Sequence, residues 1–153
     1  MQNPKIDIEF LLEGDLPTYS TDGSACLDLK ANWNKDHVLW CTNRIPLEPG
    51  ETAKFPTGIA VAIPKGYVGL ICSRSGLALD GVQVANSPGV IDSDYRGSIG
   101  ILLYNSTNHE VFIEHGQRIA QLMIIKCEQV EWNVVKELPS TTRGSGGFGS
   151  TGK

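Results

Sequence analysis

The chain has 153 residues, of which 41% are hydrophobic and 20% charged, a composition that fits one folded domain and argues against a disordered chain. Its formal net charge of −4, from 13 basic and 17 acidic residues, argues against a protein that coats nucleic acid, since such proteins present basic faces to the phosphates. No apolar run approaches the roughly 18 residues of a membrane span and the N-terminus lacks the pattern of a signal peptide, so we expect a cytoplasmic protein, or one of the host-cell interior if viral.

Short β-prone runs separated by turn residues fill most of the chain. Helical periodicity is nearly absent, and the one predicted helical turn, Ser75–Asp80, is short. Strand runs at this short spacing predict an all-β sandwich or barrel. The predicted strands are Ile6–Leu12, Thr52–Ile63, Tyr67–Ser73, Ser98–Asn105, Glu110–Glu114, Arg118–Cys127 and Val130–Val135.

Two stretches do not fit this pattern. Residues 31–44, with Trp33 and Trp40, are expected to form a strand partly covered by an insertion, and they suggest no chemistry. In residues 139–153, eleven positions are Gly, Ser or Thr, and Phe148 is the one large apolar side chain. Such a segment cannot bury enough surface to offset its ordering entropy. We therefore predict a β-rich catalytic domain over residues 1–138 and a flexible C-terminal lid over residues 139–153.

Neither the cysteines nor the glycine-rich C-terminus forms a standard motif. The four cysteines include no CxxC pair, and the three histidines complete no zinc-finger pattern, so we expect reduced, mostly buried thiols. The segment Gly147–Lys153 matches the first part of a P-loop, GxxxxGK. A P-loop needs a buried strand before it and a helix after it, and this context is not expected here.

Five clusters of polar residues and glycines carry candidate chemistry. In Gly23–Leu29, Asp28 lies between two leucines, so its carboxylate should bind main-chain groups, an arginine or a metal-bound water, or simply stabilise a turn. The second cluster, Cys72–Ala78, follows a predicted strand and opens the helical turn. Main-chain N–H groups, a hydroxyl and the Arg74 guanidinium can converge there on an anion, the alternative being an N-cap serine beside a surface arginine.

The third cluster, Val84–Gly97, contains an amide, two carboxylates and a phenol. Strand alternation would put Asp92 and Asp94 on one face and Tyr95 on the other, unless a turn breaks the register. One Asp could act as a base while the other makes structural bonds. The alternative is a polar hairpin.

The last two clusters lie near the C-terminus. In Gly116–Leu122, which enters a strongly apolar strand, Gln121 points either to a ligand or only to a turn. In Arg143–Gly152, Arg143 can clamp an anion and Phe148 can stack on a ring, within a backbone able to wrap closely around a ligand. The alternative is a dangling tail.

Together and in this order, the clusters resemble the five motifs of the homotrimeric dUTP pyrophosphatase (dUTPase) family. The resemblance rests on the segments SRSGLA, GVIDSDYRG, GQRIAQL and RGSGGFGSTG and runs from Leu16 to Gly152. It implies a jelly-roll-like β subunit in a homotrimer, in which three subunits build each active site and the C-terminal arm of one closes over it. It also implies hydrolysis of dUTP to dUMP and pyrophosphate, with water attacking the α-phosphorus and Mg²⁺ held by the triphosphate.

The same resemblance gives each candidate residue a role. Asp92 resembles the general base for the water, Tyr95 the ring packed against deoxyribose, and Asp28 an acidic residue near a metal-bound water. Asn86 and the main chain of residues 86–95, Gly89 included, would read the uracil edge. Phe148 would cover the uracil, and the triphosphate contacts would be Arg74, Ser75, Gly76, Gln121, Arg143, Gly149, Ser150 and Thr151.

Two residues of the motifs have no assigned role in the site, and two alternative functions have to be considered. Arg118 is expected to be structural, and Cys26 stands where the family usually has glycine, which bears on the main-chain geometry before Asp28. The first alternative is a dCTP deaminase or a bifunctional relative, which shares the fold and the trimer. Such enzymes use a glutamate for deamination and usually lack the Asp-Ser-Asp-Tyr run. A non-catalytic regulatory protein could reuse the fold, although the intact set of candidate residues argues against it.

Overall fold

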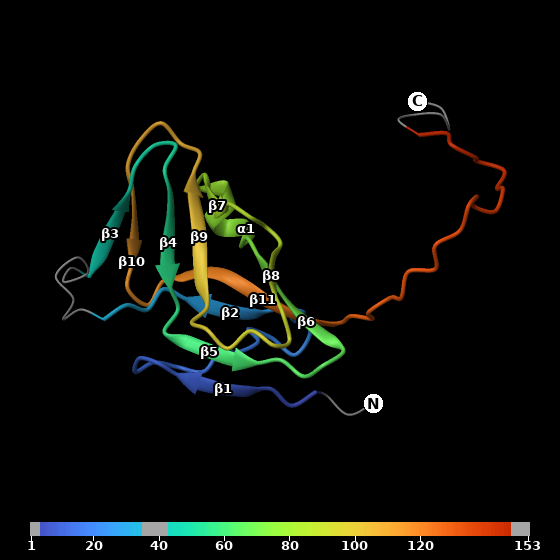
Figure 1. Cartoon of the computed structure of the whole chain (residues 1–153). Coiled ribbons are helices and arrows are strands. Elements are labelled where there is room, and N and C mark those ends of the chain that lie inside the picture. The colour runs from blue at the N-terminus through green and yellow to red at the C-terminus, as the bar shows by residue number, and fades with distance from the viewer. Residues whose placement is uncertain (1–3, 35–42, 148–153) are drawn as a thin grey trace.

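The structure is a computed structural model that describes residues 4–34 and 43–147 (Figure 1). In these residues the chain forms strands that all pair antiparallel, and one short helix, α1 (Ser75–Leu79). The strands are β1 (Asp7–Phe10), β2 (Leu27–Lys30), β3 (Arg44–Leu47), β4 (Thr52–Pro56), β5 (Ile59–Ala62), β6 (Tyr67–Cys72), β7 (Val82–Val84), β8 (Gly89–Ile91), β9 (Gly100–Asn105), β10 (Val111–Glu114) and β11 (Arg118–Lys126).

The strands form four small sheets that enclose one core. Their orders are β1-β5, β10-β3, β4-β9-β7 and β2-β11-β6-β8. In Figure 1, β3, β10, β4 and β9 run through the upper part of the body, β2 and β11 cross below them, and β5 and β1 run along the bottom. The prediction of an all-β, jelly-roll-like subunit is thereby confirmed.

Alternating side chains fill the interior. On β9, Ile101, Leu103 and Asn105 are buried while the residues between them are half-buried. The Asn105 side chain is satisfied, because its Nδ2 donates 2.9 Å bonds to the carbonyls of Leu47 and His109 and its Oδ1 accepts from Thr107. A buried amide that meets its partners in this way joins β9 to the neighbouring loops at little desolvation cost.

Most predicted strands are confirmed, with three differences. In the strand expected within residues 31–44, residues 31–34 form no strand and residues 35–42 lie outside the described residues. The run Thr52–Ile63 is divided into β4 and β5, which belong to different sheets, because the chain turns at Gly58 with φ of +72°. The predicted strand Val130–Val135 is wrong: it forms no strand in the described chain, and Trp132 and Val134 are 90% and 92% exposed. A strand needs a neighbour for its main-chain groups.

After β11, residues 127–147 run away from the β body as an extended segment (Figure 1). Nearly all of them are exposed. Among the described residues, no helix is long and apolar enough to cross a membrane.

Candidate functional site

Three neighbouring strands bring the first, second and fourth clusters together. Gln121 at the centre of β11 lies opposite Asp28 on β2 and opposite Cys72 on β6. Residues directly opposite one another share a face of the sheet. Arg74 follows the end of β6, so it projects beside the same face. A pocket of about 340 Å³ results, lined by Ser20, Ser24, Ala25, Cys26, Asp28, Arg74, Ser75, Gly76 and Gln121.

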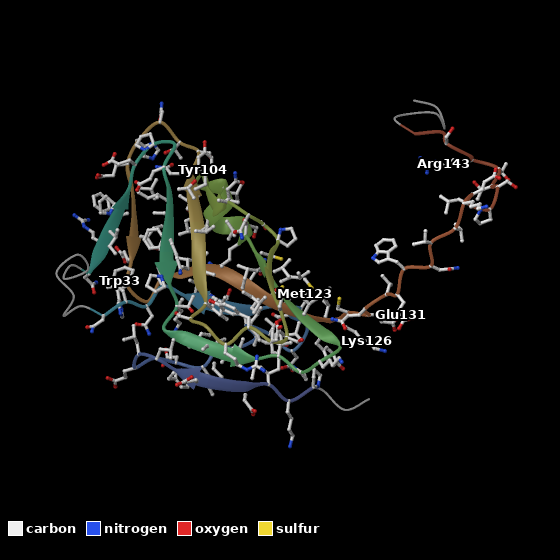
Figure 2. All side chains as sticks on the ribbon, in the orientation of Figure 1. Trp33, Tyr104, Met123, Lys126, Glu131 and Arg143 are labelled. Atoms are coloured by element: carbon white, nitrogen blue, oxygen red, sulfur yellow. The ribbon has the colours of Figure 1, made fainter. Side chains whose placement is uncertain are left out.

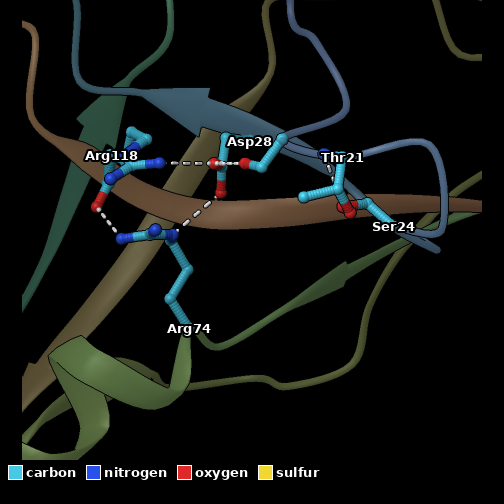
Figure 3. A network of polar contacts seen from close by, with 6 residues as sticks. Thr21, Ser24, Asp28, Arg74 and Arg118 are labelled. Atoms are coloured by element: carbon cyan, nitrogen blue, oxygen red, sulfur yellow. Dashed lines mark hydrogen bonds and ion pairs between the residues drawn. The ribbon is translucent and has the colours of Figure 1, made fainter.

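The Asp28 carboxylate is the centre of a polar network in this pocket (Figure 3). Its Oδ1 accepts a 2.8 Å bond from Arg74 Nε, and its Oδ2 accepts bonds from Arg118 Nη1 at 3.1 Å and Ser20 Oγ at 3.0 Å. The Asp28 and Arg74 side chains are only 16% and 25% exposed. Burial by itself raises the pKa of Asp28, but the hydrogen bonds from Ser20, Arg74 and Arg118 outweigh it, so this pKa is lowered.

A second set of bonds holds the main chain just before Arg74. Gln121 Nε2 donates a 2.8 Å bond to the carbonyl of Ser73. The Ser73 hydroxyl accepts a 2.9 Å bond from the amide of Val84, and the Ser73 amide donates a 3.3 Å bond to Ser87 Oγ. Ser73 therefore fixes the position of Arg74, a role that the sequence did not indicate.

Helix α1 begins at Ser75, and Ser75 does not cap it. The N-cap position is Arg74, and no side-chain hydrogen bond caps the helix. The alternative of an N-cap serine is therefore wrong, since Ser75 and Gly76 instead lie exposed at the pocket wall. The first N–H groups of any helix have no partner within that helix, so they suit an anion here.

The third cluster forms the edge strand β8 and the turns on either side of it. Gly89 pairs with Ile71 on β6, and a Cβ at Gly89 would lie 3.2 Å from Nδ2 of Asn86. Glycine at this position lets the Asn86 amide approach the strand closely. Asn86 itself is exposed, so its amide can also meet a ligand.

Asp92, Asp94 and Tyr95 lie in a turn that breaks the strand register, which is the exception that the sequence leaves open. Strand β8 ends at Ile91, and the amide of Tyr95 donates a 3.2 Å bond to the carbonyl of Asp92. The Tyr95 hydroxyl donates a 3.1 Å bond to the carbonyl of Ser98. Both carboxylates line a wide cleft of about 1190 Å³, whose wall also includes Lys65, Tyr67, Arg96, Lys126 and Cys127.

The two pockets lie at opposite ends of β6. Ile91 pairs with Gly69 near the start of β6, whereas Arg74 follows its end at Cys72. Because β8 runs antiparallel to β6, Asp92, the residue after Ile91, lies beside Val68, the residue before Gly69. Arg74 is six positions further along the chain than Val68, which corresponds to about 20 Å of strand. The two pockets share no lining residue. Within one chain, Asp92 and Arg74 therefore cannot touch the same phosphate group.

Arg143, the C-terminal candidate that the structure describes, lines neither pocket. Arg143 lies in the exposed segment that leaves the body, and its Nε donates a 2.9 Å bond to the carbonyl of Gly146 (Figure 2). Phe148, Gly149, Ser150 and Thr151 lie outside the described residues.

The described thiols are less buried than expected. Cys26 and Cys72 are half-buried and Cys127 is exposed, so the prediction of mostly buried thiols is wrong for them. Burial, with smaller contributions from Cys72 and Asp28, raises the pKa of the Cys26 thiol. Cys26 lines the pocket. Because a raised pKa disfavours the thiolate, which is the nucleophilic form, Cys26 is suited to shaping the pocket rather than to acting as a nucleophile.

A β-sheet floor, a fixed guanidinium, an amide, hydroxyls and the start of a helix are groups with which proteins bind small phosphorylated ligands. A family model described as dUTPase matches residues 13–152 of the chain. The chain therefore belongs to the dUTPase family.

Curated relatives and solved structures agree with this membership. The deoxyuridine 5'-triphosphate nucleotidohydrolase of Desulfotalea psychrophila is 47% identical, over 95% of this chain and 97% of the relative. That of Rickettsia canadensis is 48% identical, over 91% of this chain and 89% of the relative. A variant dUTPase of Staphylococcus bacteriophage 80alpha, solved with dUpNHpp, is 28% identical with a TM-score of 0.82, covering 99% of this chain and 100% of that chain. A variant dUTPase from phage phi11 of S. aureus, described with a structural Mg(II) ion, is 25% identical with a TM-score of 0.76, over 90% and 100% of the two chains.

Proposed function

We propose that this protein hydrolyses dUTP to dUMP and pyrophosphate. The observation that carries the proposal is the Arg74 guanidinium, which Asp28 and the Arg118 carbonyl hold beside Gln121 and the start of α1. The curated relatives at 47% and 48% identity are named for hydrolysis of this nucleotide. Both lines support a site for the triphosphate of a deoxynucleotide.

Arg74, Ser75, Gly76 and Gln121 would contact the triphosphate. Phosphoryl transfer needs positioning and neutralisation of charge more than covalent help. A guanidinium that is already fixed by a carboxylate needs no rearrangement when the phosphates arrive, which favours catalysis by preorganised electrostatics.

The base and sugar would bind at the third cluster. Strand β8 is the last strand of its sheet, so one edge of its main chain is not used by β6. That edge, with the Asn86 amide, offers the donors and acceptors that a uracil edge requires. Tyr95 would pack against deoxyribose and leave no room for a 2′-hydroxyl. Cytosine would leave some of these groups unpaired and would therefore bind more weakly.

Asp92 would act as the general base. Its carboxylate is exposed to the wide cleft, so it can accept a proton from a water that attacks the α-phosphorus. The bond between the α-phosphorus and the bridging oxygen would then break, releasing pyrophosphate. The ligand of the phage 80alpha structure, dUpNHpp, is named with an NH group between the α- and β-phosphates, at the bond that this reaction would break.

The residues of the pocket fit Mg²⁺ only in an indirect way. The described residues include no group of three or more His, Cys, Asp or Glu side chains that could hold a metal ion. A carboxylate can accept about four hydrogen bonds, and Asp28 already accepts three. The remaining position suits a metal-bound water, so Mg²⁺ would be held mainly by the triphosphate. When bound, Mg²⁺ would neutralise charge on the phosphates.

A homotrimer would bring the Arg74 pocket of one copy next to the Asp92 cleft of another. Asp92 and Arg74 are about 20 Å apart along β6, so one nucleotide needs Asp92 from one copy and Arg74 from another. The apolar residues Val90, Val130 and Trp132 are 58%, 73% and 90% exposed in the single chain and would be covered in such an assembly. The C-terminal lid, with Arg143, Phe148, Gly149, Ser150 and Thr151, would close over a site built by its neighbours.

The direct test is to incubate purified protein with dUTP and Mg²⁺ and to measure pyrophosphate. We expect release from dUTP, little release from UTP or dCTP, and loss of activity when a chelator removes Mg²⁺. Ammonia released from dCTP without pyrophosphate from dUTP would indicate a deaminase instead. Absence of turnover with every nucleotide would indicate a non-catalytic protein. Light scattering should give three times the chain mass, and a monomeric active enzyme would contradict the shared site.

A further inference from the structure

Strand β11 begins with a β-bulge that changes which face Arg118 occupies. Arg118 lies opposite Lys30, but Ala120 rather than Ile119 lies opposite Leu29, so the register shifts between them. Ile119 and Ala120 are accordingly both fully buried. In a regular strand, Arg118 would face away from Gln121, since they are three positions apart and side chains alternate between the two faces. The bulge turns Arg118 to the face that Gln121 and Asp28 share.

On that face Arg118 contacts two other members of the network. Its Nη1 donates a 3.1 Å bond to Oδ2 of Asp28, and its main-chain carbonyl accepts a 3.3 Å bond from Nη1 of Arg74. Asp28 Oδ1 in turn accepts the bond from Arg74 Nε. The Arg74 guanidinium is thus held at two nitrogens, by Asp28 and by the main chain of Arg118 (Figure 3).

Arg118 does not line the pocket in which Arg74 would meet the phosphates. It lines a neighbouring cavity of about 600 Å³, whose wall also includes Asp15, Asp28, Lys30 and His115. Its side chain therefore acts on Arg74 through Asp28.

We infer that Arg118 is a positioning residue for phosphate binding: it fixes the Asp28 carboxylate and the Arg74 guanidinium in the orientation that receives the triphosphate. This inference rests on the proposed function. Without the Arg118 guanidinium, Asp28 Oδ2 keeps only the bond from Ser20. The carboxylate that holds Arg74 Nε is then less firmly fixed, and Arg74 with it. Charge-assisted hydrogen bonds of this kind are the strong ones in proteins.

The test compares R118Q with the matched control K30Q. Lys30 lies opposite Arg118 on β2, and K30Q removes the same charge, but its partner is the exposed Asp15 rather than Asp28. We expect R118Q to raise the KM for dUTP and the Kd for dUpNHpp about tenfold, with a smaller change in kcat. K30Q should change both by less than about twofold.

A second comparison separates positioning from a general loss of structure. In a D28N background, R118Q should have little further effect on the Kd for dUpNHpp, because its target is already gone. R118K retains the charge and should restore part of the affinity. Thermal unfolding of each variant shows whether it is folded, and should R118Q fail to fold, R118K carries the same comparison against K30R.

The outcomes separate the two proposals. If the parent protein releases no pyrophosphate from dUTP, the proposed function fails. If the parent is active but R118Q, or R118K in its place, binds dUpNHpp as well as its lysine control, the positioning role fails. Equal losses from R118Q in the parent and in D28N would also overturn it, because Arg118 would then act independently of Asp28.

Discussion

Gln121 on β11 donates a 2.8 Å hydrogen bond to the main-chain carbonyl of Ser73, at the point where β6 ends and the segment with Arg74 begins. Gln121 is half-buried and lines the pocket of Arg74 as well. One amide therefore serves two purposes: its bond to Ser73 positions the segment that precedes Arg74, and its side chain also forms part of the pocket wall.

Substitution of Gln121 by Glu should impair the enzyme severely. A carboxylate cannot donate to the Ser73 carbonyl, and its charge would repel the triphosphate. We expect kcat/KM for dUTP to fall about 10²-fold, measured as pyrophosphate release. The matched control is Q83E, the same chemical change at an exposed position of β7. If Q121E retained the activity of Q83E, Gln121 would have no part in the site.

The Asp28 network should make stability depend on pH in a defined direction. The folded-state pKa of Asp28 is lowered, because the hydrogen bonds from Ser20, Arg74 and Arg118 outweigh the effect of burial. Its contribution to stability is therefore present above the unfolded-state pKa of about 3.9 and is lost as the pH falls through the lowered folded-state pKa. The free energy of unfolding of D28N should be lower than that of the parent by about 2 kcal/mol at pH 7.

That difference should shrink as the pH falls below about 4, and it should be lost once the pH lies below the lowered folded-state pKa, where both proteins carry an uncharged side chain at this position. Urea unfolding at several pH values measures it. D15N is the matched control, because Asp15 also has a lowered pKa, from its hydrogen bond and charge interaction with Lys30, but lies exposed. A loss in D28N that is no larger than in D15N would contradict the stabilising role of the network.

The sequence predicted strands where apolar residues recur over five or more positions, as in β6, β9 and β11. It missed β2, β3, β7 and β8 as separate strands. Three residues, as in β7 and β8, are too few for a periodic pattern, β2 contains Asp28 and Lys30, and β3 contains Pro46. The single run predicted over residues 52–63 hides a turn at Gly58, because its neighbours Thr57 and Ile59 are both β-branched residues typical of strands.

For the site, the motifs indicated which residues matter but not how they meet. The partners of Asp28 lie 46 and 90 positions away in sequence, so spacing could not pair them. The bulge before Ala120 is equally hidden, because Ile119 and Ala120 look like a regular apolar strand. Serines at positions 20 and 73 act through hydrogen bonds to distant groups, and short polar residues between strands are otherwise typical of turns.

Replacement of Gly97 by Ala should disturb Tyr95 selectively. A Cβ at Gly97 would overlap the Tyr95 hydroxyl and ring, so the ring would have to leave its position above the turn. We expect kcat/KM for dUTP to fall about tenfold and discrimination against UTP to weaken, since one displaced contact costs on the order of 1–3 kcal/mol. G23A is the control, because a Cβ at Gly23 meets no atom within 4 Å. Unchanged discrimination in G97A would remove Tyr95 from sugar recognition.

Asp92 and Asp94 offer a matched pair for the catalytic step. They line the same cleft and differ by two positions, and both are exposed. Asp92→Asn should lower kcat about 10²–10⁴-fold while the Kd for dUpNHpp stays within a few-fold, as expected when a general base is lost. Asp94→Asn should leave kcat within a few-fold of the parent. Equal effects of the two substitutions would contradict the choice of Asp92 as the base.

The C-terminal lid can be tested by removing residues 143–153. Residues 139–147 are almost entirely exposed and lie beyond the β body, so their loss should leave the melting temperature and the oligomeric mass nearly unchanged. Turnover of dUTP should nevertheless fall by about 10² or more, because a lid contributes only when it closes on bound nucleotide and excludes water. The point variant Arg143→Ala should show a smaller loss of the same kind. Among the described residues, the Arg143 side chain bonds only the Gly146 carbonyl of its own segment, so it is available to an anion. A truncated protein that hydrolyses dUTP at the full rate would show that the β body alone completes the site.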